Sequence, residues 1–305
     1  MQFFAYFISS FSFLVILFPC THNQHLPAMH NYNFSQTMRS LPLAKRIMRS
    51  FVAVCAIALV FAFTFAQTLE AQSSRPRRFS MGIYGAYGLD MHNANFLDLP
   101  TRPIFRPRTG GSNEPGPFSN ANAWNPAFGI TMEYMVTQEL GIALRGHFAF
   151  QNARLTTRSQ YRVGRDDGTF DDGVSEFSLE TDVQMISLEP MAQYNIWEGL
   201  FVHLGARLNF ITQIDYLQYE SLIAPEDGGF FTNGSRTRNV SSGELPEATK
   251  FSIAPIVGLS YAIPIIDRLT VHPEVFYSFG LFPVAGELAW TVNSLRPGLA
   301  VKYKF

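Results

Sequence analysis

The sequence predicts an all-β fold, an eight-stranded antiparallel up-and-down transmembrane β-barrel. Three observations lead to this fold class. After about residue 79, apolar residues recur at every second position in eight separate segments, which is the period of a strand with one apolar face. The joins between these segments are alternately short and long, the rhythm of a chain that crosses a membrane repeatedly as a barrel. Charged residues make up 15% and aromatic residues 14% of the chain, a balance low in charge and rich in aromatics for a soluble protein.

The front of the chain has the layout of a secretory signal peptide. A basic stretch, Lys45 to Arg49, precedes an apolar run over 51–65, and small and polar residues follow. This order of basic, apolar and small residues is typical of an export signal that is later removed. We place the cleaved signal peptide at 48–71, with cleavage after Ala66 or Ala71.

The predicted signal peptide divides the chain into three parts. Residues 1–47 are a start-site artefact or an extended leader, and a second membrane anchor is the alternative. Residues 72–305 form the barrel domain. Cys20 and Cys55 are the two cysteines, and both precede the predicted cleavage sites. The mature chain therefore has no thiol, which excludes disulfides, thiolate metal sites and cysteine nucleophiles.

Each predicted strand has one apolar face and one small or polar face. The strands cover 79–91, 128–136, 140–151, 186–196, 200–210, 251–261, 269–279 and 294–305. Short joins lie near 137–139, 197–199 and 265–268, and long joins near 97–126, 156–180, 213–249 and 282–293. Positions that pair across a short turn must share a face, and the expected pairs 131 with 145, 189 with 207 and 258 with 274 satisfy this condition.

Four prolines lie on the apolar faces of these strands, at Pro190, Pro255, Pro273 and Pro297. A proline removes one donor from a ladder of hydrogen bonds, and a closed barrel has no edge at which to place it. The sequence therefore predicts a β-bulge at each proline.

The last strand carries the most specific motif. Its apolar face ends in Leu299, Val301, Tyr303 and Phe305. This alternation with a terminal Phe resembles the closing strand of bacterial outer-membrane β-barrels, in which the terminal aromatic is read by the assembly machinery. The architecture of 79–305 is similar to OmpA-like barrel domains. The resemblance implies the outer membrane of a Gram-negative bacterium, with outer-membrane lipids and the barrel-assembly machinery as partners.

A soluble β-sandwich is the alternative fold, because its strands also alternate. Its apolar face would be a buried core and its polar face would meet water. The export signal, the terminal Phe and the small residues on the polar face favour the membrane. A sheet that spans lipid must close into a barrel. Lipid cannot form hydrogen bonds, so the backbone groups of an open edge strand would have no partner.

The polar faces place ionisable side chains inside the barrel, whose interior with eight strands is just wide enough for side chains to fill. The expected lumen charge network consists of Glu133, Arg145, Glu189, Arg207, Glu274, Arg296 and Lys302. Glu189 is expected across from Arg207, and Glu133 diagonally from Arg145. The network predicts a salt-bridge plug, since buried charges persist when paired; a narrow gated pore is the alternative. Three further inward residues, His147, His203 and His272, lack the close spacing of metal ligands, so we predict no metal and no cofactor.

The long loops 97–126, 156–180 and 213–249 are the expected surface for an extracellular ligand, because long connections usually carry function. The third loop is expected to extend a strand pair above the membrane. Asp-Asp-Gly appears twice, at 166–168 and 171–173; hairpin turns explain it more simply than calcium.

The function predicted from the sequence is a structural or surface-interaction role. The alternative is a small-solute channel, and a lipid-modifying enzyme is less favoured because the strand histidines point inward and none has a serine two residues later. The formal charge of −1 gives no support to a nucleic-acid partner.

Overall fold

The computed structural model describes residues 78–97, 99, 116–165, 168–226, 229–231, 233–286 and 288–305. The predicted leader and signal peptide, most of the first long loop, and Asp166 and Asp167 lie outside the described residues. Within these described ranges, no helix is long and apolar enough to cross a membrane.

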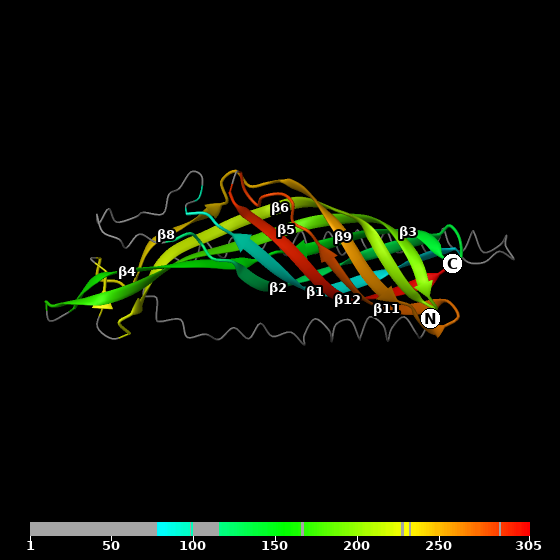
Figure 1. Ribbon diagram of the computed structural model, residues 1–305, viewed down its shortest axis with the longest axis horizontal. Coiled ribbons are helices and arrows are strands. Elements are labelled where there is room, and N and C mark those ends of the chain that lie inside the picture. Colours follow the sequence, from blue (N-terminus) through cyan, green and yellow to red (C-terminus); the bar gives the residue numbers. More distant parts are fainter. Residues whose placement is uncertain are drawn as a thin grey trace, which may run out of the picture. The chain divides into compact units, whose positions relative to one another are not determined.

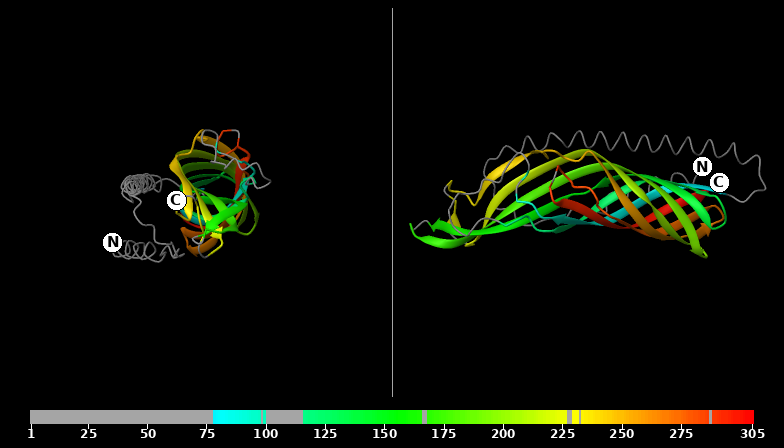
Figure 2. Two further views of the ribbon diagram at one scale, coloured as in Figure 1. Left: turned by 90° about the vertical axis from the view of Figure 1, so that its left-hand side faces the viewer. Right: turned by 45° about the horizontal axis from the view of Figure 1, so that its top comes forward.

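Twelve strands form one antiparallel sheet. They are β1 (Phe79–Ala94), β2 (Ala121–Met135), β3 (Leu140–Phe150), β4 (Ala153–Arg165), β5 (Phe170–Trp197), β6 (Leu200–Ala224), β7 (Gly229–Phe230), β8 (Thr237–Glu244), β9 (Phe251–Tyr261), β10 (Ile263–Ile266), β11 (Leu269–Ser278) and β12 (Trp290–Lys304). Because β12 pairs with β1 and β5 pairs with β6, the pairing β1–β2–β3–β5–β6–β9–β11–β12 closes into a ring. Figure 1 shows the tilted strands, and the end-on view in Figure 2 shows the ring. The predicted eight-stranded barrel is confirmed.

Two barrel strands are much longer than predicted. β5 has 28 residues and β6 has 25. Residues 156–180, expected as a loop, are mostly a hairpin in which β4 pairs with the first half of β5. The prediction of a loop was wrong because the alternation there is reversed, with polar residues outside and apolar residues inside. The expected strand pair in 213–249 is confirmed, since β6 continues to Ala224 and pairs with β8.

The predicted registers are correct around two of the three short turns. Thr131 lies opposite Arg145, and the β5–β6 pairs on both sides of Glu189 place it opposite Arg207. Gly258, however, pairs with Phe276 rather than with Glu274. The turn lies at Asp267 and Arg268, so the hairpin is centred one position later than predicted and the partner of Gly258 moves by two residues. A shift of two leaves every side chain on its predicted face.

The predicted β-bulges at the four prolines are wrong. The β5–β6 ladder is interrupted around Pro190 and the β1–β12 ladder around Pro297. The ladders on their other sides, β3–β5 and β11–β12, continue past the same prolines without a register shift. Each of these prolines is thus accommodated by a local gap in one ladder, on the side that its missing N–H would face.

An apolar belt surrounds the part of the barrel that is next to the short turns. It consists of outward-facing Ile142, Leu144, Ile186, Leu188, Leu204, Val257, Leu259, Val275, Leu295 and Leu299. Aromatic side chains lie at both margins, with Tyr134, Tyr194 and Tyr261 near the short turns and Tyr87, Trp124, Phe210 and Phe251 at the other margin. β6 crosses this belt between Leu200 and Phe210, within the about 9–11 residues of a tilted transmembrane strand.

Above the belt, the same strands continue as an extension. We define the extension as β4, residues 170–184 of β5, residues 213–224 of β6, β7 and β8. It projects at the left of Figure 1. From 173 to 193 the odd-numbered side chains of β5 are buried, but their character changes from Glu189 and Gln193 in the belt to Phe177 and Leu179 in the extension. The extension is therefore built like a water-soluble sheet, whereas the belt is built for lipid.

Candidate functional site

The lumen within the belt holds a cluster of buried charges. All seven predicted members are buried: Glu133, Arg145, Glu189, Arg207, Glu274, Arg296 and Lys302. They come from strands around the whole ring, so pairs form across the lumen as well as between neighbouring strands. We call this set, with Asp90, the lumen network.

Arg145 is the centre of the lumen network. Its guanidinium group lies between two rings, 4.0 Å from the centroid of Tyr84 and 4.3 Å from that of Phe276. It donates to Glu274 at 2.9 Å and to Glu189 at 3.5 Å. Stacking and charge pairing together offset the desolvation of a cation that has almost no exposure to solvent.

The pairing differs in part from the sequence prediction. Arg207 donates to Glu189 at 2.6 Å, in the expected register. Glu133, however, accepts from Lys302 at 2.5 Å instead of pairing with Arg145. The diagonal placement of Glu133 and Arg145 is confirmed by the β2–β3 register, but their ion pairs form with residues on other strands. The closed ring brings Glu133 of β2 near Lys302 of β12 and lets Arg145 of β3 reach β11.

Asp90 is a member of the network that the sequence prediction missed. It accepts a hydrogen bond from Asn125 at 2.9 Å and lies 3.8 Å from the Arg296 guanidinium. With Asp90, the network contains four carboxylates and four cations. The sequence could have indicated Asp90, because it falls on the polar face of the first predicted strand. The seven predicted charges comprise four cations and three carboxylates, so one carboxylate was missing.

Two of the three histidines predicted to point inward contact cations of the lumen network. His147 Nε2 contacts Arg296 at 3.0 Å, and His272 Nδ1 contacts Lys302 at 3.3 Å. His203 Nε2 contacts the Ser260 hydroxyl at 2.8 Å, a serine–histidine pair that the sequence prediction did not foresee. The other ring nitrogen of His203 has no hydrogen-bond partner, so this pair lacks the group that orients a catalytic histidine. In the described part of the chain, no group of three or more His, Cys, Asp or Glu side chains could hold a metal ion.

Gly258 provides the space in which the Phe276 ring lies beside Arg145. A Cβ atom on Gly258 would lie 2.2 Å from the ring of Phe276. Replacing Gly258 with Val should therefore displace the ring from Arg145 and lower the free energy of unfolding by about 1–3 kcal/mol, the usual cost of overpacking. Urea titration of the folded barrel in lipid vesicles measures this change. A Gly146→Val variant is the control, because a Cβ at Gly146 meets nothing within 4 Å; equal losses in the two variants would contradict the explanation.

The lumen beyond the network is filled by a second, apolar cluster. Its buried members include Ala94, Phe96, Leu99, Phe118, Leu155, Phe177, Leu179, Val183, Met185, Ile214, Tyr216, Leu245 and Trp290. They come from the extension, from the neighbouring ends of barrel strands such as β1 and β12, and from segments that connect the strands. Two successive layers, one charged and one apolar, thus occupy the barrel interior.

The outer face of the extension carries charged pairs. Arg154 lies 3.3 Å from Glu176 and 3.7 Å from Glu180, and Arg158 lies 3.2 Å from Glu176. Tyr219 donates to Glu180 at 2.8 Å. Burial, followed by this hydrogen bond, raises the pKa of Tyr219 above its ordinary value. Such a face is suited to water and to a polar partner.

The predicted sorting strand completes the ring as β12. The Phe305 ring packs 4.9 Å from that of Tyr303 and 5.6 Å from that of Phe79. Leu299 is exposed on the belt and Val301 is partly exposed. Recognition of these residues by the assembly machinery stays a prediction.

No protein-family model and no curated protein matches the sequence. Among solved structures, Neisserial surface protein A is 14% identical, with 74% of this chain and 97% of that chain covered and a TM-score of 0.30. Ail of Yersinia pestis is 9% identical, with 74% and 99% covered and a TM-score of 0.30. The outer-membrane protease OmpT of Escherichia coli is 9% identical, with 77% and 99% covered and a TM-score of 0.31. At such TM-scores the fold assignment rests on this chain's own strand pairing, belt and lumen.

Proposed function

We propose that this outer-membrane β-barrel is a sealed anchor whose extension binds a partner outside the cell. The observation that carries the proposal is the reversal of polarity along β5 and β6. A protein that only had to close its barrel would need short loops above the belt. Here two strands continue far beyond the belt and build a separate apolar core.

The two layers of the lumen support a sealed barrel. Ion pairs bridge opposite walls at the level of the belt, as between Arg145 and Glu274. Above them the apolar cluster fills the interior with large side chains such as Trp290 and Phe177. A steady water-filled path would require both layers to open. The filled interior therefore favours the anchor over the small-solute channel.

The extension supports a binding role because it is a rigid sheet with free surface. The interior cluster holds its strands together, and the charged pairs keep its outer face soluble. Among the described strands, β8 pairs with β6 and stands at one end of the strand order. Function in proteins concentrates on such elements when a rigid scaffold positions them.

Shortening the β4–β5 hairpin tests this function. Thr157 pairs with Phe177, so residues 158–176 can be replaced by an Asn-Gly turn without touching the belt. We expect the shortened barrel to keep heat-modifiable migration on a gel and to lose binding of whole cells to immobilised extracellular glycans and proteins. An Arg158→Gln variant, which keeps the hairpin, is the matched control.

Planar-bilayer recordings of the full-length barrel add a second measurement, in which we expect no steady open channels. Steady conductance, or full binding by the shortened barrel, would contradict the proposal.

A further inference from the structure

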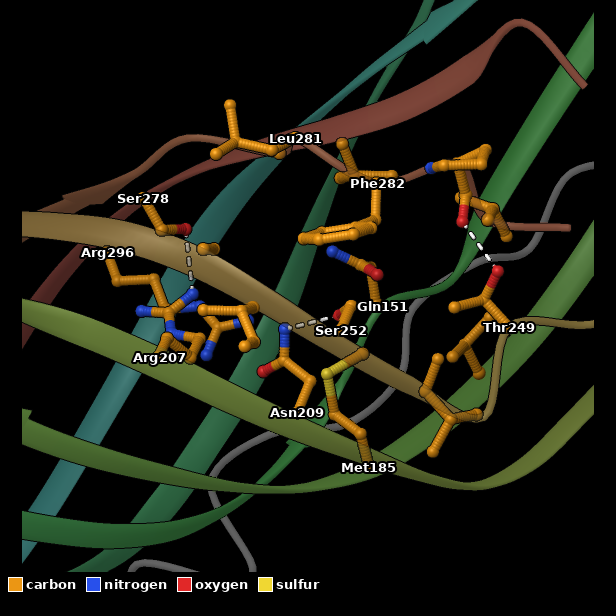
Figure 3. A pocket seen from close by; sticks show the side chains of 18 residues that line it. Gln151, Met185, Arg207, Asn209, Thr249, Ser252, Ser278, Leu281, Phe282 and Arg296 are labelled. Carbon is orange, nitrogen blue, oxygen red and sulfur yellow. Dashed lines mark hydrogen bonds between the residues drawn. The ribbon is translucent and has the colours of Figure 1, made fainter. Parts of the chain in front are cut away.

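A cavity of about 50 Å³ lies where the lumen network meets the apolar cluster (Figure 3). Its polar lining includes Arg207, Arg296, Asn209, Ser252 and Ser278. None of the described residues that line it is Asp or Glu. The cavity thus presents two guanidinium groups, amides and hydroxyls, a set of donors that suits an anion.

Arg296 is the lumen cation with the weakest compensation. Its nearest carboxylate is that of Asp90, at 3.8 Å, and its other contacts are Ser294 and His147, both at 3.0 Å. The other three lumen cations each have a carboxylate oxygen within 2.9 Å. A buried cation without a close counter-charge is costly, and an anion in the cavity would remove that cost.

The cavity lies beside a gap in the strand pairing of the barrel wall. Its lining includes Ser252 and also Ile253, Leu281 and Phe282, whose side chains are exposed to the surroundings of the protein. The wall is open there because β9 and β11 stop pairing: their last backbone contact is the hydrogen bond from Phe279 to Pro255. The next backbone hydrogen bond between these segments joins Thr249 to Val284. The opening lies at the margin of the apolar belt, and its rim is apolar.

From this geometry we propose that the cavity binds the acid group of an amphipathic anion, a carboxylate or phosphate on an acyl chain. The acid group contacts Arg296 and Arg207 inside the wall. The chain lies outside the wall, along Ile253, Leu281 and Phe282. The size of the cavity supports this division, since it has room for a few water molecules or one acid group and not for a whole chain.

Native mass spectrometry of the full-length protein in a neutral detergent tests the proposal. The probes are dodecanoate, dodecyl phosphate, dodecanol and acetate. We expect one dodecanoate or one dodecyl phosphate per barrel, and weaker binding of dodecanol and acetate. If only one of the two acids binds, it identifies the source of the ligand as a free fatty acid or as a lipid phosphate.

Three variants locate the site. Arg296→Met should weaken binding of the acid by about tenfold or more, as expected for the loss of a charge-assisted hydrogen bond. Phe282 lies on an exposed loop, where a substitution does not put folding at risk. Phe282→Asp should weaken binding of the acid because it removes an apolar contact with the acyl chain. Arg154→Met, outside the cavity, should have no effect.

Equal binding by wild type and both cavity variants would overturn the proposal. So would dodecanol binding as tightly as dodecanoate, or no bound acid at all.

Discussion

Replacing Arg145 with Met is expected to lower the free energy of unfolding by about 3–5 kcal/mol. Met keeps much of the volume between the rings of Tyr84 and Phe276 but removes the charge. Glu274 and Glu189 then remain buried without their shared cation. Glu189 keeps Arg207, so the cost arises mainly from Glu274, because burying a charge without a partner is far more expensive than losing one surface contact.

Urea unfolding in phospholipid vesicles, followed by heat-modifiable migration, measures this loss. Arg154→Met is the matched control, since Arg154 also pairs with glutamates but its side chain is 49% exposed, compared with 2% for Arg145. The control should lose no more than about 1 kcal/mol, the range of surface ion pairs. If the two variants lose the same stability, the lumen network is not a buried structural element.

The belt could be predicted from the sequence because lipid imposes a simple rule on it. Each strand there needs apolar residues at every second position, and a strand such as 200–210 shows this directly. Short turns also fix the register of a hairpin, which is why Thr131 and Arg145 were placed opposite each other correctly. The register of Gly258 was missed because the turn lies at Asp267 and Arg268, one position after the centre that the predicted pair implies.

The extension and the lumen pairs could not be predicted in the same way. In the extension apolar and polar residues still alternate, but the apolar residues face inward and the polar residues outward. Phe177 and Leu179 were therefore assigned to a loop, because the prediction looked for strands with an apolar outer face. The correct ion pairs depend on contacts across the closed ring. Lys302 and Glu133 are distant in the chain and not on adjacent strands, and local spacing carries no information about such a pair.

Cysteine labelling along β5 tests the boundary between belt and extension most directly. Four even-numbered side chains of β5 are exposed or partly exposed, so the single variants Glu180→Cys, Asp182→Cys, Leu188→Cys and Ala192→Cys sample one face of one strand. The background carries Cys20→Ser and Cys55→Ser, which removes both native cysteines. The protein is folded in lipid vesicles and treated with a water-soluble maleimide.

The account predicts rapid labelling at positions 180 and 182, and labelling at 188 and 192 only after the lipid is removed and the protein is unfolded. Labelling of 188 and 192 at the rate of 180 and 182 in intact vesicles would contradict it, because the apolar belt would then face water.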